Sequence, residues 1–193
     1  LLPLLDEDPQ TAVSRAQEVL ETYAGRYASH WLAGMRTKCG LSACRAVEDD
    51  DDKALIEALL DIMAQQGADF TLTFYQLSRL ADQPSERDNR LRGLFDQPAH
   101  IDAWLQRWRQ RLTLEPQNDA VRQQSMRSIN PVYIPRNHRI EAAIRAAEDE
   151  GDFSVFRDLH AVLQNPYAEQ QGKQSYMREP RPEEVVQYTF CGT

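Results

Sequence analysis

Apolar residues recur at steps of three and four along most of the chain, which is the spacing of one face of an α-helix. The pattern predicts about seven helices, with expected ranges near 9–35, 49–66, 70–80, 101–112, 119–129, 136–150 and 153–164. Alternation with period two, the pattern of a half-buried strand, is almost absent. We therefore expect an all-α fold, an irregular multi-helix domain with an extended C-terminal tail.

Capping residues mark the ends of several expected helices. Asp8, followed by proline, is typical of a helix start, and Asp69 and Asn118 are expected to act in the same way. Gly67 and Gly151 follow the last periodic residues of two helices, where a left-handed C-cap is common. These local signals support the expected boundaries.

Two segments lack helical periodicity. Residues 81–90 have the composition of a loop, and residues 166–193 are rich in Pro and Gln without a sustained period. The expected organisation is a helical region, 1–165, and an extended tail, 166–193, that ends near Cys191.

Composition narrows the class of protein. The 193 residues carry a formal charge of -8 with a pI near 5.0, which argues against a nonspecific nucleic-acid binder. No apolar run approaches the roughly 20 residues that span a bilayer. Three cysteines are too few for a disulfide scaffold. We expect no nucleic-acid or membrane partner.

Charge is unevenly distributed along the chain. The run Asp49–Asp52 is predicted to be a solvated helix start that complements the helix dipole, rather than a cation site. Every basic residue of 62–147 is Arg, so this segment pairs either with an acidic partner or, as we favour, with the chain's own acids. Trp104 and Trp108 are expected in the core, not on a nucleic-acid stacking platform.

Residue patterns reveal no self-contained active site. The four histidines have no metal-ligand spacing, and the glycines are isolated, so neither a metal site nor a phosphate-binding loop is predicted. Cys39 and Cys44 are interpreted as buried or idle thiols. Cys191 lies on the tail, where a thiol could reach another part of a longer protein, although a dispensable exposed cysteine fits the pattern better.

Five strings carry a family resemblance. Residues 126–137, Met-Arg-Ser-Ile-Asn-Pro-Val-Tyr-Ile-Pro-Arg-Asn, together with 151–153, 163–167, 31–41 and 69–78, resemble the C-terminal part of the selenoprotein O (SelO) family. The resemblance implies a parent with a protein-kinase-like fold that transfers AMP from ATP, with Mg or Mn, to hydroxyl groups of proteins. The catalytic groups would lie in an N-terminal core that these 193 residues lack. No catalytic residue, metal or cofactor is therefore assigned to this chain, which we expect to be inert alone and to have that core as its partner.

The resemblance also gives roles to individual residues. Cys191 occupies the place of selenocysteine in many eukaryotic members, and the resemblance therefore implies a redox candidate that forms a reversible disulfide with a cysteine of the core. A structural role is expected for the family-string residues, with prolines stiffening the connection, Asn137 capping a helix and Arg136 bridging helices. These residues are Asn130, Pro131, Tyr133, Arg136 and Asn137.

One alternative and two further expectations complete the sequence-based picture. The alternative is a free-standing helical adaptor that docks a partner helix or acidic peptide through the Arg-bearing face of 101–112. A bacterial, cytoplasmic protein is expected, or a mitochondrial one if the source is eukaryotic. A helical region without its catalytic partner is also expected to expose an apolar face and self-associate.

Overall fold

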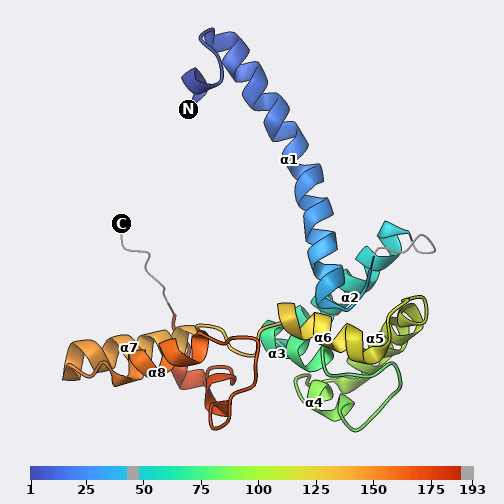
Figure 1. Cartoon of the computed structure of the whole chain (residues 1–193), viewed down its shortest axis with the longest axis vertical. Coiled ribbons are helices and arrows are strands. Elements are labelled where there is room, and N and C mark those ends of the chain that lie inside the picture. Colours follow the sequence, from blue (N-terminus) through green and yellow to red (C-terminus); the bar gives the residue numbers. More distant parts are fainter. Residues whose placement is uncertain (43–47, 188–193) are drawn as a thin grey trace.

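The computed structural model describes residues 1–42 and 48–187. In these ranges the chain consists of helices joined by irregular segments and contains no strand (Figure 1). The α-helices are α1 (Pro9–Lys38), α2 (Asp49–Gln66), α3 (Phe70–Leu77), α4 (Asp88–Arg92), α5 (Pro98–Leu112), α6 (Asp119–Ile129), α7 (Asn137–Glu150) and α8 (Ser154–Leu163). Single turns of 3₁₀-helix are η1 (Leu2–Leu4), η2 (Gln174–Tyr176) and η3 (Pro182–Glu184). The all-α prediction is confirmed.

The expected caps form as predicted. The Asp8, Asp69 and Asn118 side chains accept hydrogen bonds from the backbone N–H three residues further on. Gly67 and Gly151 end α2 and α7 with φ of 62° and 66°, the left-handed region that glycine enters without a Cβ clash.

The prediction of a loop over 81–90 is confirmed for 81–87, which are not helical, and is wrong for 88–90, which belong to helix α4. This helix has only five residues and buries two of them, Asp88 and Leu91, so it is too short to generate a helical period in the sequence. Contacts with other parts of the chain stabilise this short helix: Leu91 packs in the main core, and Asp88 pairs with Arg109 of α5.

The main core is formed by the C-terminal part of α1 together with helices α2 to α6. Trp104 and Trp108 of α5 lie at its centre, with 2% and 0% of their surfaces exposed and their rings stacked at 6.0 Å. Their indole N–H groups donate to the carbonyls of Leu55 and Cys39 at 2.7 and 2.9 Å. The core interpretation of these tryptophans is confirmed, and both polar atoms are satisfied.

A second, smaller cluster holds the C-terminal part of the chain. It contains Tyr75, Val132, Tyr133 and Val162, against which Tyr176 and other tail residues pack. The tail between 166 and 187 is mostly irregular, apart from η2 and η3, and Arg139 of α7 donates a hydrogen bond to its Ser175 carbonyl. Helices α7 and α8 form a hairpin beside the main core (Figure 1).

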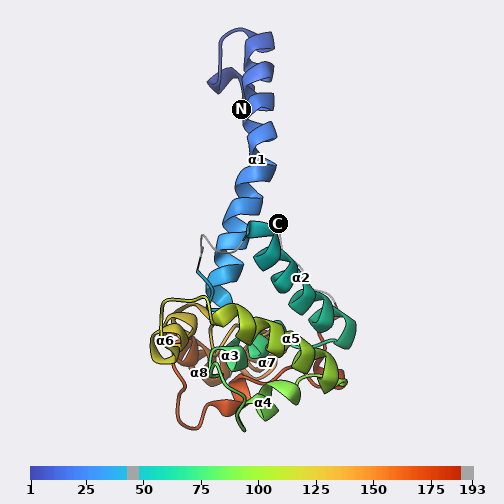
Figure 2. The ribbon, with the colours of Figure 1, turned by 90° about the vertical axis from the view of Figure 1, so that its right-hand side faces the viewer.

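Helix α1 projects from this body instead of packing along it (Figures 1 and 2). Leu32 and Met35 near its C-terminus enter the main core, but the apolar residues of its middle turns are exposed. The α1 stripe consists of Val19, Leu20, Tyr23 and Tyr27, each 58–69% exposed. Within the described residues, no helix is both long and apolar enough to cross a membrane.

Candidate functional site

The family string of residues 126–137 lies where three parts of the fold meet. It covers the end of α6, the extended connection and the start of α7. Asn130, 1% exposed, donates from Nδ2 to the Lys38 carbonyl at 2.9 Å, and its Oδ1 accepts from Lys38 Nζ at 3.1 Å. The Lys38 ammonium also lies 5.4 Å from the centre of the Phe74 ring. Asn130 thus joins the end of α6 to the end of α1.

The middle of the string holds the tail. The backbone N–H groups of Val132 and Tyr133 donate to the Pro166 carbonyl at 2.7 and 3.1 Å. The Tyr133 side chain is 2% exposed, and its hydroxyl accepts from the Gln170 backbone N–H at 3.0 Å. Tyr133 therefore links the connection to the segment that follows α8.

Arg136 lies at the N-terminal end of α7 and reaches back to the cap of α3. Its guanidinium donates to both carboxylate oxygens of Asp69, at 2.6 and 3.1 Å, in a bidentate pair. Arg136 is 7% exposed, so the pair is largely shielded from water. Burial opposes ionisation of Asp69, but bonds from Arg136 and the Leu72 backbone N–H outweigh it, and the pKa of Asp69 is lowered. The pair ties α3 to α7.

Asn137 does not play the capping role that was predicted for it. Helix α7 begins at Asn137, so Arg136 occupies the N-cap position, and no side chain caps this end. The Arg136 guanidinium is engaged by Asp69, and Asn137 is exposed. The N-cap therefore lies one residue before the predicted position, a difference that is common because local sequence defines helix ends only to within one or two residues.

The cysteine predictions have different outcomes. Cys191 and Cys44 lie outside the described residues. Cys39 is buried at the end of α1, as predicted, and burial raises the pKa of its thiol to about 12. A thiol that is neutral at physiological pH and inaccessible is not a nucleophile. In the described ranges, no three His, Cys, Asp or Glu side chains are placed to hold a metal ion.

The acidic run at the start of α2 divides into exposed and buried members. Asp49, Asp50 and Asp51 are exposed, as predicted, but Asp52 is 1% exposed, so the prediction of a solvated side chain is wrong there. Arg36 Nε donates to Asp52 Oδ2 at 2.6 Å, and Arg111 Nε donates to Oδ1 at 2.7 Å. The run therefore places one carboxylate between two buried guanidinium groups.

The arginines of α5 pair within the chain. Arg111 binds Asp52 and Glu115, and Arg109 binds Asp88 at 2.9 Å and the Ala81 carbonyl. Intramolecular pairing was the favoured interpretation, and these contacts confirm it for both side chains. Arg109 and Arg111, two arginines of the segment 101–112 that the adaptor alternative uses for docking, are thus already engaged.

Sequence reasoning missed one apolar site. The hairpin of α7 and α8 encloses an open groove, and its phenylalanines, Phe153 and Phe156, are both 54% exposed. A signal was present, because the spacing of Ile140, Ala143 and Ile144 marks a face of α7 that faces α8. That spacing does not say whether a third element covers the face.

Comparison with known families defines the class of protein. The family described as "Protein adenylyltransferase SelO" matches residues 6–164, so most of the matched stretch is the helical region described above. The chain belongs to the SelO family of protein nucleotidyltransferases.

Individual relatives agree with this assignment. Proteins named "Protein nucleotidyltransferase YdiU" from Rhizobium johnstonii and Rhodopseudomonas palustris are 49% and 50% identical to the chain, and one from a Bradyrhizobium strain is 45% identical. Each match covers 100% of this chain but 38% of the relative. The chain therefore spans well under half the length of the relatives it matches.

Proposed function

We propose that this chain is the C-terminal helical part of a bacterial protein adenylyltransferase that transfers AMP from ATP to hydroxyl side chains of proteins. Family membership and the names of the relatives support the activity, and the bacterial sources of those relatives support the setting. ATP and Mg or Mn belong to the larger protein in this proposal, as does a cytoplasmic location. The chain contributes a scaffold against which a kinase-like core packs.

The exposed α1 stripe is the observation that carries the scaffold role. Four large apolar side chains lie on one face of a helix that projects from its own core. Such a face is typical of a surface that is covered in the complete protein, because isolated solvent-exposed helices carry polar residues all round. The relatives have the additional length needed to cover it.

The proposal also divides the chain into a helical region and a tail. Residues 1–165 form the helical region in this proposal, and residues 166–193 form a tail that brings Cys191 towards the core for reversible disulfide chemistry. The tail up to residue 187 is held by Tyr133 and Arg139, which supports a defined path for the chain. The residues Asn130, Pro131, Tyr133, Arg136 and Asn137 have a structural role.

The test of the activity uses the full-length protein. Purified protein is incubated with a protein substrate, magnesium or manganese, and ATP labelled either at the α- or at the γ-phosphate. AMP transfer predicts covalent label only from the α-phosphate. Label from the γ-phosphate would show phosphoryl transfer and contradict the proposal.

The test of the scaffold role compares two substitutions in α1 of the full-length protein. Leu20→Asp, in the α1 stripe, is expected to lower the melting temperature by several degrees, because it places a charge in a covered apolar contact. Ser29→Asp introduces the same charge on another face of the helix, at an exposed position, and should have little effect. Equal melting temperatures for both variants would contradict the scaffold role.

The adaptor alternative makes a different prediction. It requires a coding region that begins near Leu1 with no kinase-like sequence before it. The structure offers it little support, since Arg109 and Arg111 of its docking face are engaged by Asp88 and Asp52.

A further inference from the structure

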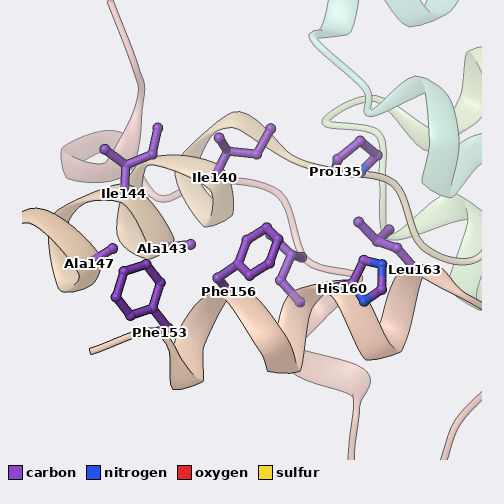
Figure 3. A pocket seen from close by; sticks show the side chains of 10 residues that line it. Pro135, Ile140, Ala143, Ile144, Ala147, Phe153, Phe156, His160 and Leu163 are labelled. Carbon is purple, nitrogen blue, oxygen red and sulfur yellow. The ribbon is translucent and has the colours of Figure 1, made fainter. Parts of the chain in front are cut away.

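The hairpin of α7 and α8 carries a second uncovered apolar surface, separate from the α1 stripe. It is an open groove of about 460 Å³ between the two helices. Figure 3 shows side chains of α7 and α8 on facing sides of this groove. The α7–α8 groove is lined by carbon atoms of, among others, Ile140, Ile144, Ala147, Phe153, Phe156 and Leu163.

The shape of the α7–α8 groove favours an apolar occupant. Ala143 and Ala147 keep the α7 side shallow, while Phe153 and Phe156 rise from the other side with about half of their surfaces exposed. The His160 ring lies nearly parallel to that of Phe156, with centroids 6.0 Å apart. No Asp, Glu, Lys or Arg is among the lining residues. A charged ligand would therefore lose its hydration there without gaining an oppositely charged partner.

The described part of the chain does not fill this groove. The tail packs on other residues of α7, where Arg139 donates to the Ser175 carbonyl and lies 5.1 Å from the centre of the Tyr176 ring. His138, 8% exposed, borders the segment around Glu184. None of the described tail residues from 166 to 187 is among those lining the groove.

The hairpin is held in a fixed place before any occupant binds. The bidentate pair of Arg136 and Asp69 ties the start of α7 to the main core, and the Pro166 carbonyl ties the end of α8 to Val132 and Tyr133. The groove is thus presented at a set position relative to the core that also carries α1.

We propose that the α7–α8 groove receives an apolar segment of the same polypeptide, from the part of the full-length protein that lies outside these 193 residues. The proposal rests on the proposed function, which assigns this chain to a longer protein. More than half of each relative lies outside the matched stretch, and that length supplies an occupant in cis. An occupant in the same polypeptide needs no association from solution, because its effective concentration is high.

The test is site-specific photo-crosslinking in the full-length protein. Phe156 is replaced by p-benzoylphenylalanine, which keeps an aromatic ring in the groove, and Ala161, exposed on another face of α8, is replaced in a control protein. After irradiation, the monomer band is digested and the crosslinked peptides are identified by mass spectrometry. Melting temperatures equal to the wild type show that both proteins are folded.

The proposal predicts a crosslink from position 156 to an apolar peptide outside this chain, in a species of monomer mass, with at least a tenfold lower yield from position 161. A crosslinked dimer would instead assign the groove to a second copy, and capture of another protein would assign it to a separate partner. Either result, or no crosslink at all, overturns the proposal. The crosslink does not depend on AMP transfer, so an inactive protein that gives the expected peptide would refute the proposed activity alone.

Discussion

Asp52 shows how one residue in a run of identical residues acquires a distinct role. A helix advances by 100° per residue, so Asp52, which precedes Leu55, Ile56 and Leu59 by three, four and seven residues, lies at the centre of their buried face. Asp49 lies near the same face but one turn closer to the helix end, where it is exposed and binds Arg36 at 2.7 Å. That spacing could have identified Asp52 as buried. Its two partners, Arg36 and Arg111, are 16 and 59 residues away, and no local pattern selects them from the other arginines.

Removal of the Asp52 charge is predicted to destabilise the fold. Asp52→Asn leaves two buried guanidinium groups with weaker acceptors, and we expect a loss of about 3 kcal/mol in the free energy of unfolding. Urea denaturation followed by circular dichroism measures the change. Asp50→Asn, at an exposed position of the same turn, should stay within about 0.5 kcal/mol of the wild type. Similar losses for both variants would contradict the buried network.

Arg136 and Asp69 give a pH-dependent prediction. The folded state lowers the pKa of Asp69, so the stabilisation from this pair is present above the unfolded pKa and is lost as the pH falls through the folded pKa. Arg136→Ala should cost about 2 kcal/mol at pH 7, and the difference from wild type should shrink below about pH 4. Denaturation curves at pH 7 and pH 3 measure it.

Two controls separate a structural role from a chemical one at Arg136. Asp69→Asn and the double variant complete a mutant cycle, whose coupling energy isolates the pair. An unchanged melting temperature in Arg136→Ala, combined with loss of AMP transfer in the full-length protein, would show that the structural role is wrong.

At the scale of whole elements, the local sequence predicts where a helix forms better than it predicts what packs against that helix. Caps such as Asp8 and Gly67 act on adjacent residues, so their positions were predictable. Helix α4 was not, because contacts with α5 stabilise it. The periodicity of α1 predicted a helix, but the same apolar spacing describes a buried face and an uncovered one.

The end of α1 depends on a close contact between helices. Gly40 has a φ of 70°, and a Cβ there would lie 2.6 Å from Met126 Sδ of α6 and 2.8 Å from Arg122 Cγ. Both the backbone conformation and the contact therefore require glycine. Gly40→Ala is predicted to lower the free energy of unfolding of this chain by about 2 kcal/mol.

Gly34, six residues earlier and inside α1, provides a matched control. It is exposed in α1, and nothing lies within 4 Å of a Cβ built on it. Gly34→Ala should therefore raise stability by about 0.5 kcal/mol or more, because alanine has the higher helix propensity. Thermal unfolding of the two variants should show a lower melting temperature for Gly40→Ala and a higher one for Gly34→Ala than for the wild type. A loss at position 34 equal to that at position 40 would refute the steric explanation.

At the scale of the whole molecule, the described residues carry two uncovered apolar surfaces. The α1 stripe and the α7–α8 groove lie on elements held to one core, and neither is covered by the described chain. Exposed apolar area of this kind favours association in water. The all-α class was predictable from periodicity, whereas the same periodicity marks an apolar face without showing whether another element covers it.

If the catalytic groups lie in another part of the full-length protein, as proposed, this chain alone should not bind ATP. Transfer of AMP requires groups that neutralise phosphate charge, and tight ATP binding in such sites uses a metal together with Lys or Arg. In the described ranges no cluster of metal-ligating side chains is present, and Arg36, Arg109, Arg111 and Arg136 are engaged by carboxylates of the chain. Isothermal titration of ATP with magnesium into this chain should therefore give no binding heat, whereas the full-length protein in the same buffer should bind. Low-micromolar binding by the 193 residues alone would place a nucleotide site within them and contradict the scaffold role.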